Sequence, residues 1–109
     1  MPFDERLAQR VRQRLGDRAG IVEKKMFGGL AFLLHGNMSC GVYGPDLIVR
    51  MDHASAQHAL AEPGARLFDP SGRPMKGWLL VSGAALGDEQ VLGHWVGRAV
   101  EYASTLPRK

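Results

Sequence analysis

Cysteine and long apolar runs are both scarce in this sequence. Its single cysteine excludes an intramolecular disulfide and fits a reducing compartment. No apolar run approaches the roughly 20 residues that a helix needs to cross a bilayer. The first residues carry charged side chains where a signal peptide would need an apolar segment. These absences predict a cytoplasmic protein.

Aromatic residues and metal-ligand patterns are scarce as well. The two Trp, two Tyr and four Phe residues do not alternate with basic residues along a strand, as they do on sheets that stack single-stranded RNA bases. The sequence has four histidines, His35, His53, His58 and His94. None of them is spaced from another histidine, a cysteine or a carboxylate as the ligands of a metal site are. We therefore expect no metal and no cofactor.

The lone thiol, Cys40, lies in an apolar run where alternation places it on one strand face with Met38 and Val42. An apolar setting raises the pKa of a thiol and makes it a poor nucleophile. Gly28-Gly29 is not followed by a phosphate-binding fingerprint. The sequence therefore predicts a buried structural cysteine and a protein that is not an enzyme. A small-molecule binder or enzyme with a pocket near Cys40, Gly28 and Gly29 is an alternative.

The composition fits one globular domain over residues 1–109. The chain is 45% hydrophobic and 23% charged, which is ordinary for a folded protein. The net charge of +3 arises in residues 1–25, which hold seven basic and four acidic side chains, because the remainder holds seven of each. A basic N-terminal region suits nucleic acid or an acidic partner, although a solvated surface has the same composition.

Three β-rich runs follow one another at residues 22–34, 38–43 and 47–51, joined by turn-forming residues. We expect an antiparallel meander, with a bulge or bend at Gly28-Gly29 inside the first run. A later strand is expected over residues 75–81. The pattern does not give the strand order.

Helical spacing predicts three helices around these strands. Asp4 is placed to cap a helix over residues 5–15, whose apolar residues recur every fourth position. A short helix is expected over 53–61, and Asp88 is placed to cap a last helix that runs through Ala103. The predicted fold class is therefore α+β, with a two-layer arrangement of an antiparallel sheet against N- and C-terminal helices.

A basic stripe of Arg6, Arg10 and Arg14 runs along the predicted first helix. It lies about 100° around the helix from the apolar stripe. Such a stripe either keeps the flank soluble, with its stems covering apolar surface, or binds phosphates or an acidic protein.

A second motif, at residues 73–78, places two cations, a methionine and an indole where a loop enters a strand. Residues of these types are common in partner-binding surfaces, although a tight turn with a core tryptophan would use the same residues. Residues 24–26 also set cations beside an apolar side chain. The candidate partner-binding residues are Lys24, Lys25, Arg73, Met75 and Lys76.

The runs at residues 24–32, 36–38, 40–42 and 47–50, and the later run at 72–78, resemble the N-terminal domain of the TfoX/Sxy competence regulators. The similarity extends from about Phe3 to Pro107. It implies an α+β domain with helices on an antiparallel sheet and a regulatory, non-catalytic role, in which some relatives help switch on DNA-uptake genes. Full-length regulators add a C-terminal helical domain, and the chain ends where that domain would begin, so we expect a stand-alone copy.

The leading functional hypothesis is a cytoplasmic interaction domain that acts through a protein partner in transcription control. The second hypothesis is direct nucleic-acid binding through the basic stripe, which predicts an affinity that falls steeply with salt. Homodimerisation through an exposed strand edge is a further hypothesis.

Overall fold

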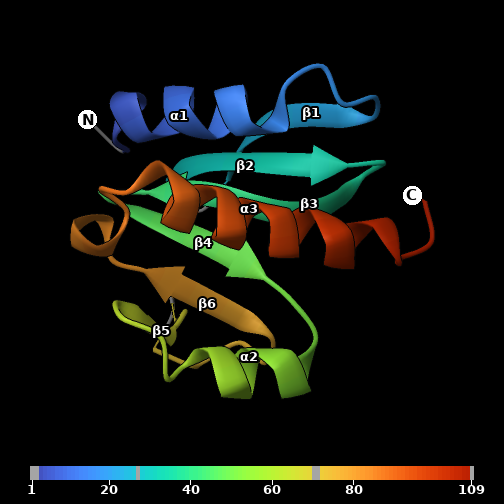
Figure 1. The fold of residues 1–109 in the computed structure, drawn as a ribbon. Coiled ribbons are helices and arrows are strands. Elements are labelled where there is room, and N and C mark those ends of the chain that lie inside the picture. Colours follow the sequence, from blue (N-terminus) through green and yellow to red (C-terminus); the bar gives the residue numbers. More distant parts are fainter. Residues whose placement is uncertain (1–2, 27, 70–71, 109) are drawn as a thin grey trace.

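The computed structural model describes residues 3–26, 28–69 and 72–108. Its elements follow the chain in the order α1 (Glu5–Leu15), β1 (Ile21–Met26), β2 (Gly29–Leu34), β3 (Asn37–Tyr43), β4 (Asp46–Arg50), α2 (His53–Ala59), β5 (Ala65–Leu67), β6 (Trp78–Val81), a 3-10 turn (Gly83–Ala85) and α3 (Glu89–Ser104) (Figure 1). The six strands form one antiparallel sheet in the order β1-β2-β3-β4-β6-β5. The predicted α+β fold class is confirmed.

Helix α1 begins and ends where the sequence indicates. The Asp4 carboxylate accepts hydrogen bonds from the backbone N–H groups of Arg6 at 2.8 Å and Leu7 at 3.2 Å, which satisfies two donors that have no partner within the helix. The helix stops at Gly16, which takes a positive φ of 60°. Its apolar stripe is buried against the sheet.

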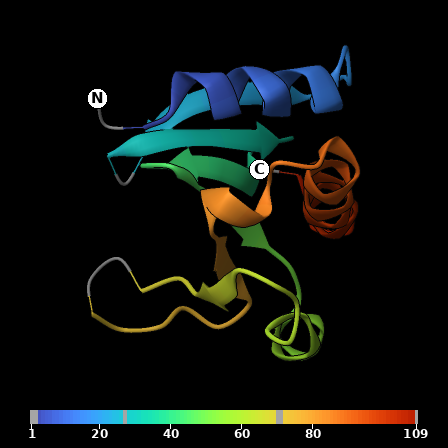
Figure 2. The same cartoon turned by 60° about the vertical axis from the view of Figure 1, so that its left-hand side comes forward.

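The helices cover one face of the sheet, which we call the helix-covered face. Figure 2 shows α2 and α3 on one side of the sheet and the loop between β5 and β6 on the other. The main core lies under the helices, where Trp95 of α3 is 1% exposed and Phe32 of β2 is fully buried. Alternation along β4 and β6 sends every second side chain into this core, including Val49 and Leu79.

The opposite face, which we call the helix-free face, holds a smaller apolar cluster. Its buried members are Ala31, Met38, Ile48, Phe68 and Leu80. The loop between β5 and β6 supplies Phe68, so a loop takes the place that a helix layer takes on the other side. This face is consequently less deeply covered than the other.

The expected bulge at Gly28-Gly29 is wrong, because a hairpin turn lies there. Met26 at the end of β1 is paired with Gly29 at the start of β2, and Gly28 between them has a φ of 75°. A Cβ at Gly29 would collide with the carbonyl oxygen of Val42, so the adjacent strand β3 also requires glycine at this position. Phe27, which the prediction also assigned to the strand, lies outside the described residues.

The expected common face of Met38, Cys40 and Val42 is wrong for Met38. The β2–β3 register shifts so that Cys40 is opposite Phe32 while Met38 is opposite Leu33. The additional residue, Ser39, is fully buried, and its hydroxyl donates to the carbonyl of Phe32 at 2.9 Å. Cys40 and Val42 therefore face the main core, and Met38 joins the cluster on the helix-free face.

Smaller differences concern the ends of elements. Strand β6 begins at Trp78 and not at Met75, and β5 was not expected at all. Asp88 caps α3 as expected, accepting from the N–H of Gln90 at 2.8 Å, and the helix ends within one residue of the predicted position. Among the described residues, none of the helices has both the length and the apolar character needed to cross a membrane.

Candidate interaction surface

The helix-free face carries partly exposed apolar side chains around its buried cluster. These side chains are Met26, Leu33, Tyr43, Met75 and Trp78. Aromatic contacts join them to the cluster, because the ring of Phe68 lies 5.4 Å from Tyr43 in an edge-on arrangement and 6.5 Å from Trp78. A sheet face with half-exposed methionines and aromatic rings has the composition of a protein-binding surface.

The loop that builds part of this face is held by backbone hydrogen bonds. Met75 donates to the carbonyl of Phe68 at 3.0 Å, and Trp78 donates back to the carbonyl of Met75 at 3.0 Å. Gly77 accepts from the N–H of Met51 at 2.8 Å and has a φ of 83°. A Cβ at Gly77 would lie 2.5 Å from the Met51 carbonyl oxygen, so this position requires glycine. The loop thereby holds Met75 against the cluster.

Cations stand at the rim of the helix-free face. Arg73 and Lys76 are exposed on the loop, and Lys24 shares the side of β1 that carries Met26. The guanidinium of Arg50 lies 5.1 Å from the ring centre of Trp78 and 5.7 Å from that of Tyr102 on α3, so this cation joins β4 to both sides of the sheet and does not belong to the helix-free face alone. Cations beside apolar groups suit a partner surface with acidic and apolar side chains.

The structure brings the predicted partner-binding residues together only in part. Met26 and Met75, one from each motif, pack on the same apolar cluster. Lys24 and the Arg73–Lys76 loop lie at opposite sides of that face, because β2, β3 and β4 separate β1 from β6. Lys25 points to the helix-covered side, since alternate residues of a strand face opposite ways. The five residues therefore do not form one continuous patch.

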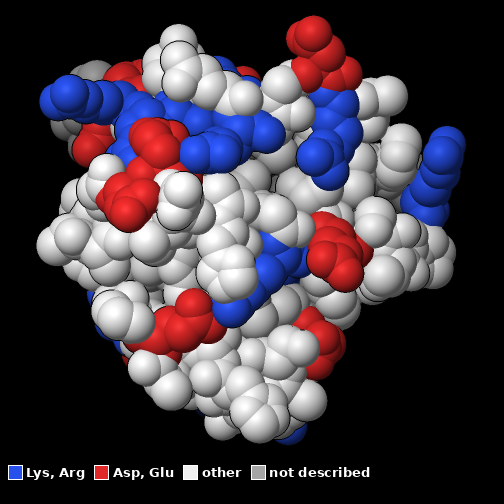
Figure 3. Space-filling model, in the orientation of Figure 1, with Lys and Arg blue, Asp and Glu red and all other residues white. Residues whose placement is uncertain are grey.

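The basic stripe joins two helices. Arg10 donates to the Glu89 carboxylate at 2.5 Å and to the Leu86 carbonyl at 2.5 Å. Arg14 donates to the Glu89 carbonyl at 2.7 Å. Arg6 is exposed. Figure 3 shows basic and acidic atoms meeting where α1 approaches the start of α3. Two of the three arginines thus hold α3 beside α1. Neither interpretation of the basic stripe, as a soluble flank or as a binding surface, included this contact.

Another arginine of α1 ties that helix to β1. Arg12 donates to both carboxylate oxygens of Glu23, at 2.7 and 2.9 Å. This hydrogen-bonded charge lowers the pKa of Glu23 and raises the pKa of Arg12. The pair joins α1 to the edge strand β1, between residues 11 positions apart in the sequence.

Cys40 is placed where its chemistry is suppressed. Its side chain is fully buried in the main core, and desolvation raises its pKa to about 12. Gly28 lies in the β1–β2 turn and is exposed, so it does not share a pocket wall with the buried thiol. This placement gives no support to a site built from Cys40, Gly28 and Gly29.

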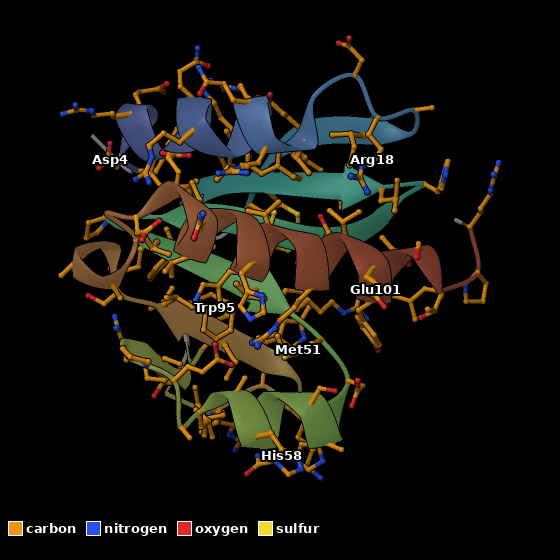
Figure 4. The ribbon with its side chains drawn as sticks, in the orientation of Figure 1. Asp4, Arg18, Met51, His58, Trp95 and Glu101 are labelled. Carbon is orange, nitrogen blue, oxygen red and sulfur yellow. The ribbon has the colours of Figure 1, made fainter. Side chains whose placement is uncertain are left out.

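A cleft of about 610 Å³ opens between α2 and α3, and no sequence pattern indicated it. Figure 4 shows Met51 between the two helices, with His58 on α2 and Glu101 on α3. Two charged groups of its wall are already paired, because Arg98 donates to Glu62 at 2.6 Å. Within the described part of the chain, no three His, Cys, Asp or Glu side chains are grouped as a metal site would need.

The sequence was also compared with known proteins. The model of the TfoX N-terminal domain family matches residues 13–103. The chain belongs to this family. The family match extends from the last turn of α1 almost to the end of α3, so it includes the whole sheet and both motifs. Searches of curated proteins and of solved structures returned no match.

Proposed function

We propose that this TfoX N-terminal domain is a non-catalytic regulatory domain that docks a protein partner of transcription control on its helix-free face. The observation that supports this is the common location of Met26 and Met75 on one apolar cluster with Tyr43 and Trp78 at its surface. Two motifs distant in the sequence contribute to one surface, and half-exposed methionines adapt well to a partner.

The partner would present apolar side chains flanked by carboxylates. Apolar burial on the Met75 and Trp78 side would supply most of the affinity, since a few central residues usually dominate an interface. The rim cations Arg73 and Lys76 would mainly orient the partner and speed association. The same chemistry disfavours a nucleic-acid partner on this face, because phosphates would leave the apolar cluster uncovered.

Capture followed by a binding measurement tests this function. The immobilised chain is used to recover proteins from cell extract, and each recovered protein is purified and titrated against variants. We expect a transcription protein whose Kd rises about tenfold or more with Arg73→Ala plus Lys76→Ala, and further with Met75→Asp. Arg18→Ala plus Arg108→Ala removes the same charge from exposed positions elsewhere and is expected to leave the Kd unchanged.

Two results would count against the proposal. A partner with no part in transcription would remove the regulatory role while leaving the surface intact. Equal Kd values for the Met75→Asp and control variants would remove the surface itself. Direct nucleic-acid binding has less support than docking of a protein, because Arg10 and Arg14 are already paired with Glu89.

A further inference from the structure

The two edges of the sheet differ in how open they are. Strand β5 at one edge has only three residues, Ala65–Leu67. Strand β1 at the other edge has six, Ile21–Met26, and among the described residues it pairs with β2 alone. Its Val22 is 60% exposed, and the three residues that follow are exposed as well. A long open edge is a template for pairing with another strand.

The outward backbone groups of β1 can be assigned from the β1–β2 ladder. His35 donates to the carbonyl of Gly20 at 2.9 Å, which marks that pair as hydrogen-bonded. Hydrogen-bonded pairs alternate along an antiparallel ladder, so the even-numbered residues of β1 bond to β2. The N–H and C=O groups of Glu23 and Lys25 therefore point away from the sheet, toward solvent.

The side chains of β1 also alternate. Glu23 and Lys25 project to the helix-covered side, where Arg12 meets Glu23. Val22, Lys24 and Met26 project to the helix-free side. Opposite charges thus occur two positions apart on one side, and apolar groups four positions apart on the other.

We propose that β1 pairs antiparallel with β1 of a second copy of this chain, about a twofold axis that passes through Lys24. In this register Glu23 is opposite Lys25 of the second copy, and by symmetry the same pair forms again. Val22 is opposite Met26 of the second copy, also twice, which covers the exposed valine. The outward backbone groups of both strands then bond to one another.

The charges select this register over its neighbours. With a perpendicular twofold axis, opposed residues must face the same side of the sheet, so the axis moves in steps of one residue. An axis through Glu23 sets Glu23 against itself, and an axis through Lys25 sets Lys25 against itself. Only the axis through Lys24 sets each Glu23, which Arg12 of its own copy already binds, opposite a Lys25, at the expense of one Lys24–Lys24 contact.

The resulting dimer joins the two sheets edge to edge and is isologous. Because a single strand edge contributes a small interface, the dimer is weak and depends on concentration. It does not rely on the proposed docking function. If both hold, however, the pairing places two helix-free faces side by side, which suits a partner that is itself twofold symmetric.

Disulfide trapping tests the register directly. Lys24→Cys places a thiol opposite its own copy in a pair that is not hydrogen-bonded, where the Cα atoms are about 4.5 Å apart. Mild oxidation is expected to give a covalent dimer from this variant. Glu23→Cys and Lys25→Cys, whose thiols lie opposite a different residue, are expected to stay mainly monomeric. Cys40 does not interfere, because it is fully buried. Equal trapping of all three variants would overturn the register.

Sedimentation of uncross-linked protein tests the pairing itself. Lys25→Pro removes an outward N–H and spares the β1–β2 ladder. It should therefore abolish the dimer and leave the Tm of the monomer close to that of the unaltered chain. Lys25→Glu and Glu23→Lys should each weaken self-association about tenfold, and an equimolar mixture of the two should restore it as a heterodimer. A chain that is monomeric at every concentration, or one that dimerises equally well with Lys25→Pro, would overturn the proposal.

Discussion

The two faces of the sheet use their apolar residues in different ways. On the helix-covered face the side chains from the sheet are closed over by α1 and α3, and Trp95 is 1% exposed. On the helix-free face only a loop lies over the cluster, and Met26, Met75 and Trp78 remain half-exposed. The first face is closed by its helices, and the second leaves apolar side chains partly exposed, where the proposed partner would dock.

The largest effect is expected from the helix-covered core. Trp95→Ala removes the largest fully buried side chain and leaves a cavity that the surrounding core cannot fill. We expect the free energy of unfolding to fall by about 3–5 kcal/mol, measured by urea denaturation. A loss no larger than that from Met75→Ala would show that the two faces do not differ in the way described.

A smaller loss is expected at the glycine that shapes the loop. Gly77→Ala forces a non-glycine residue to a φ of 83° and places its Cβ against the Met51 carbonyl. We expect a cost of about 1–3 kcal/mol in the free energy of unfolding, with a larger proportional loss of partner binding. Gly72 also has a positive φ, and no atom of the described residues lies within 4 Å of a Cβ at that position. Gly72→Ala therefore measures the cost of backbone strain without a collision.

Met75 gives the sharpest contrast between the faces. Because its side chain is half-exposed, Met75→Ala should lower the free energy of unfolding by only about 1 kcal/mol. Partner affinity should fall by a greater amount, since the interface would bury the side chain fully. Urea denaturation gives the loss in the free energy of unfolding, and titration of the same preparation gives the loss in the free energy of binding. A stability loss that exceeds the binding loss would contradict the account.

The smallest effect concerns the ion pair on the helix-covered side. The pKa of Glu23 is lowered by Arg12, so the pair stabilises the fold above the unfolded-state pKa of a glutamate and loses that contribution as the pH falls through the folded-state value. Both side chains are partly exposed, so the contribution is about 0.2–1 kcal/mol. Arg12→Gln should narrow the difference in stability between neutral and acidic pH. The measurement is the free energy of unfolding by urea at a series of pH values. If its pH dependence is the same for Arg12→Gln as for the unaltered chain, the pair contributes nothing to stability.

The sequence predicted the elements better than their pairing. The bounds of α1 follow from Asp4, Gly16 and the apolar spacing, all of which act within one helix. The Ser39 register shift and the β1–β2 hairpin turn were not predicted, because they depend on contacts between strands. Alternation alone treats the first apolar run as continuous through Gly28 and has no means of placing Met38 on the opposite face.

The candidate surface was predicted in its residues but not in its geometry. Both motifs were selected because they set cations beside apolar side chains, and that selection stays a prediction. Their joint contribution to one cluster through Met26 and Met75 depends on the strand order, which no local pattern contains. The partner of Arg10 could not be predicted either, since Glu89 lies 79 residues away.

Footprinting tests the central claim most directly. Hydroxyl radicals label exposed side chains, and the labelling of the chain alone is compared with that of the chain bound to its captured partner. The account predicts protection at Met26, Met75, Tyr43 and Trp78, with unchanged labelling of Val91 on α3, which is 36% exposed. Protection of Val91 or of the cleft between α2 and α3, with the helix-free face labelled as before, would contradict it.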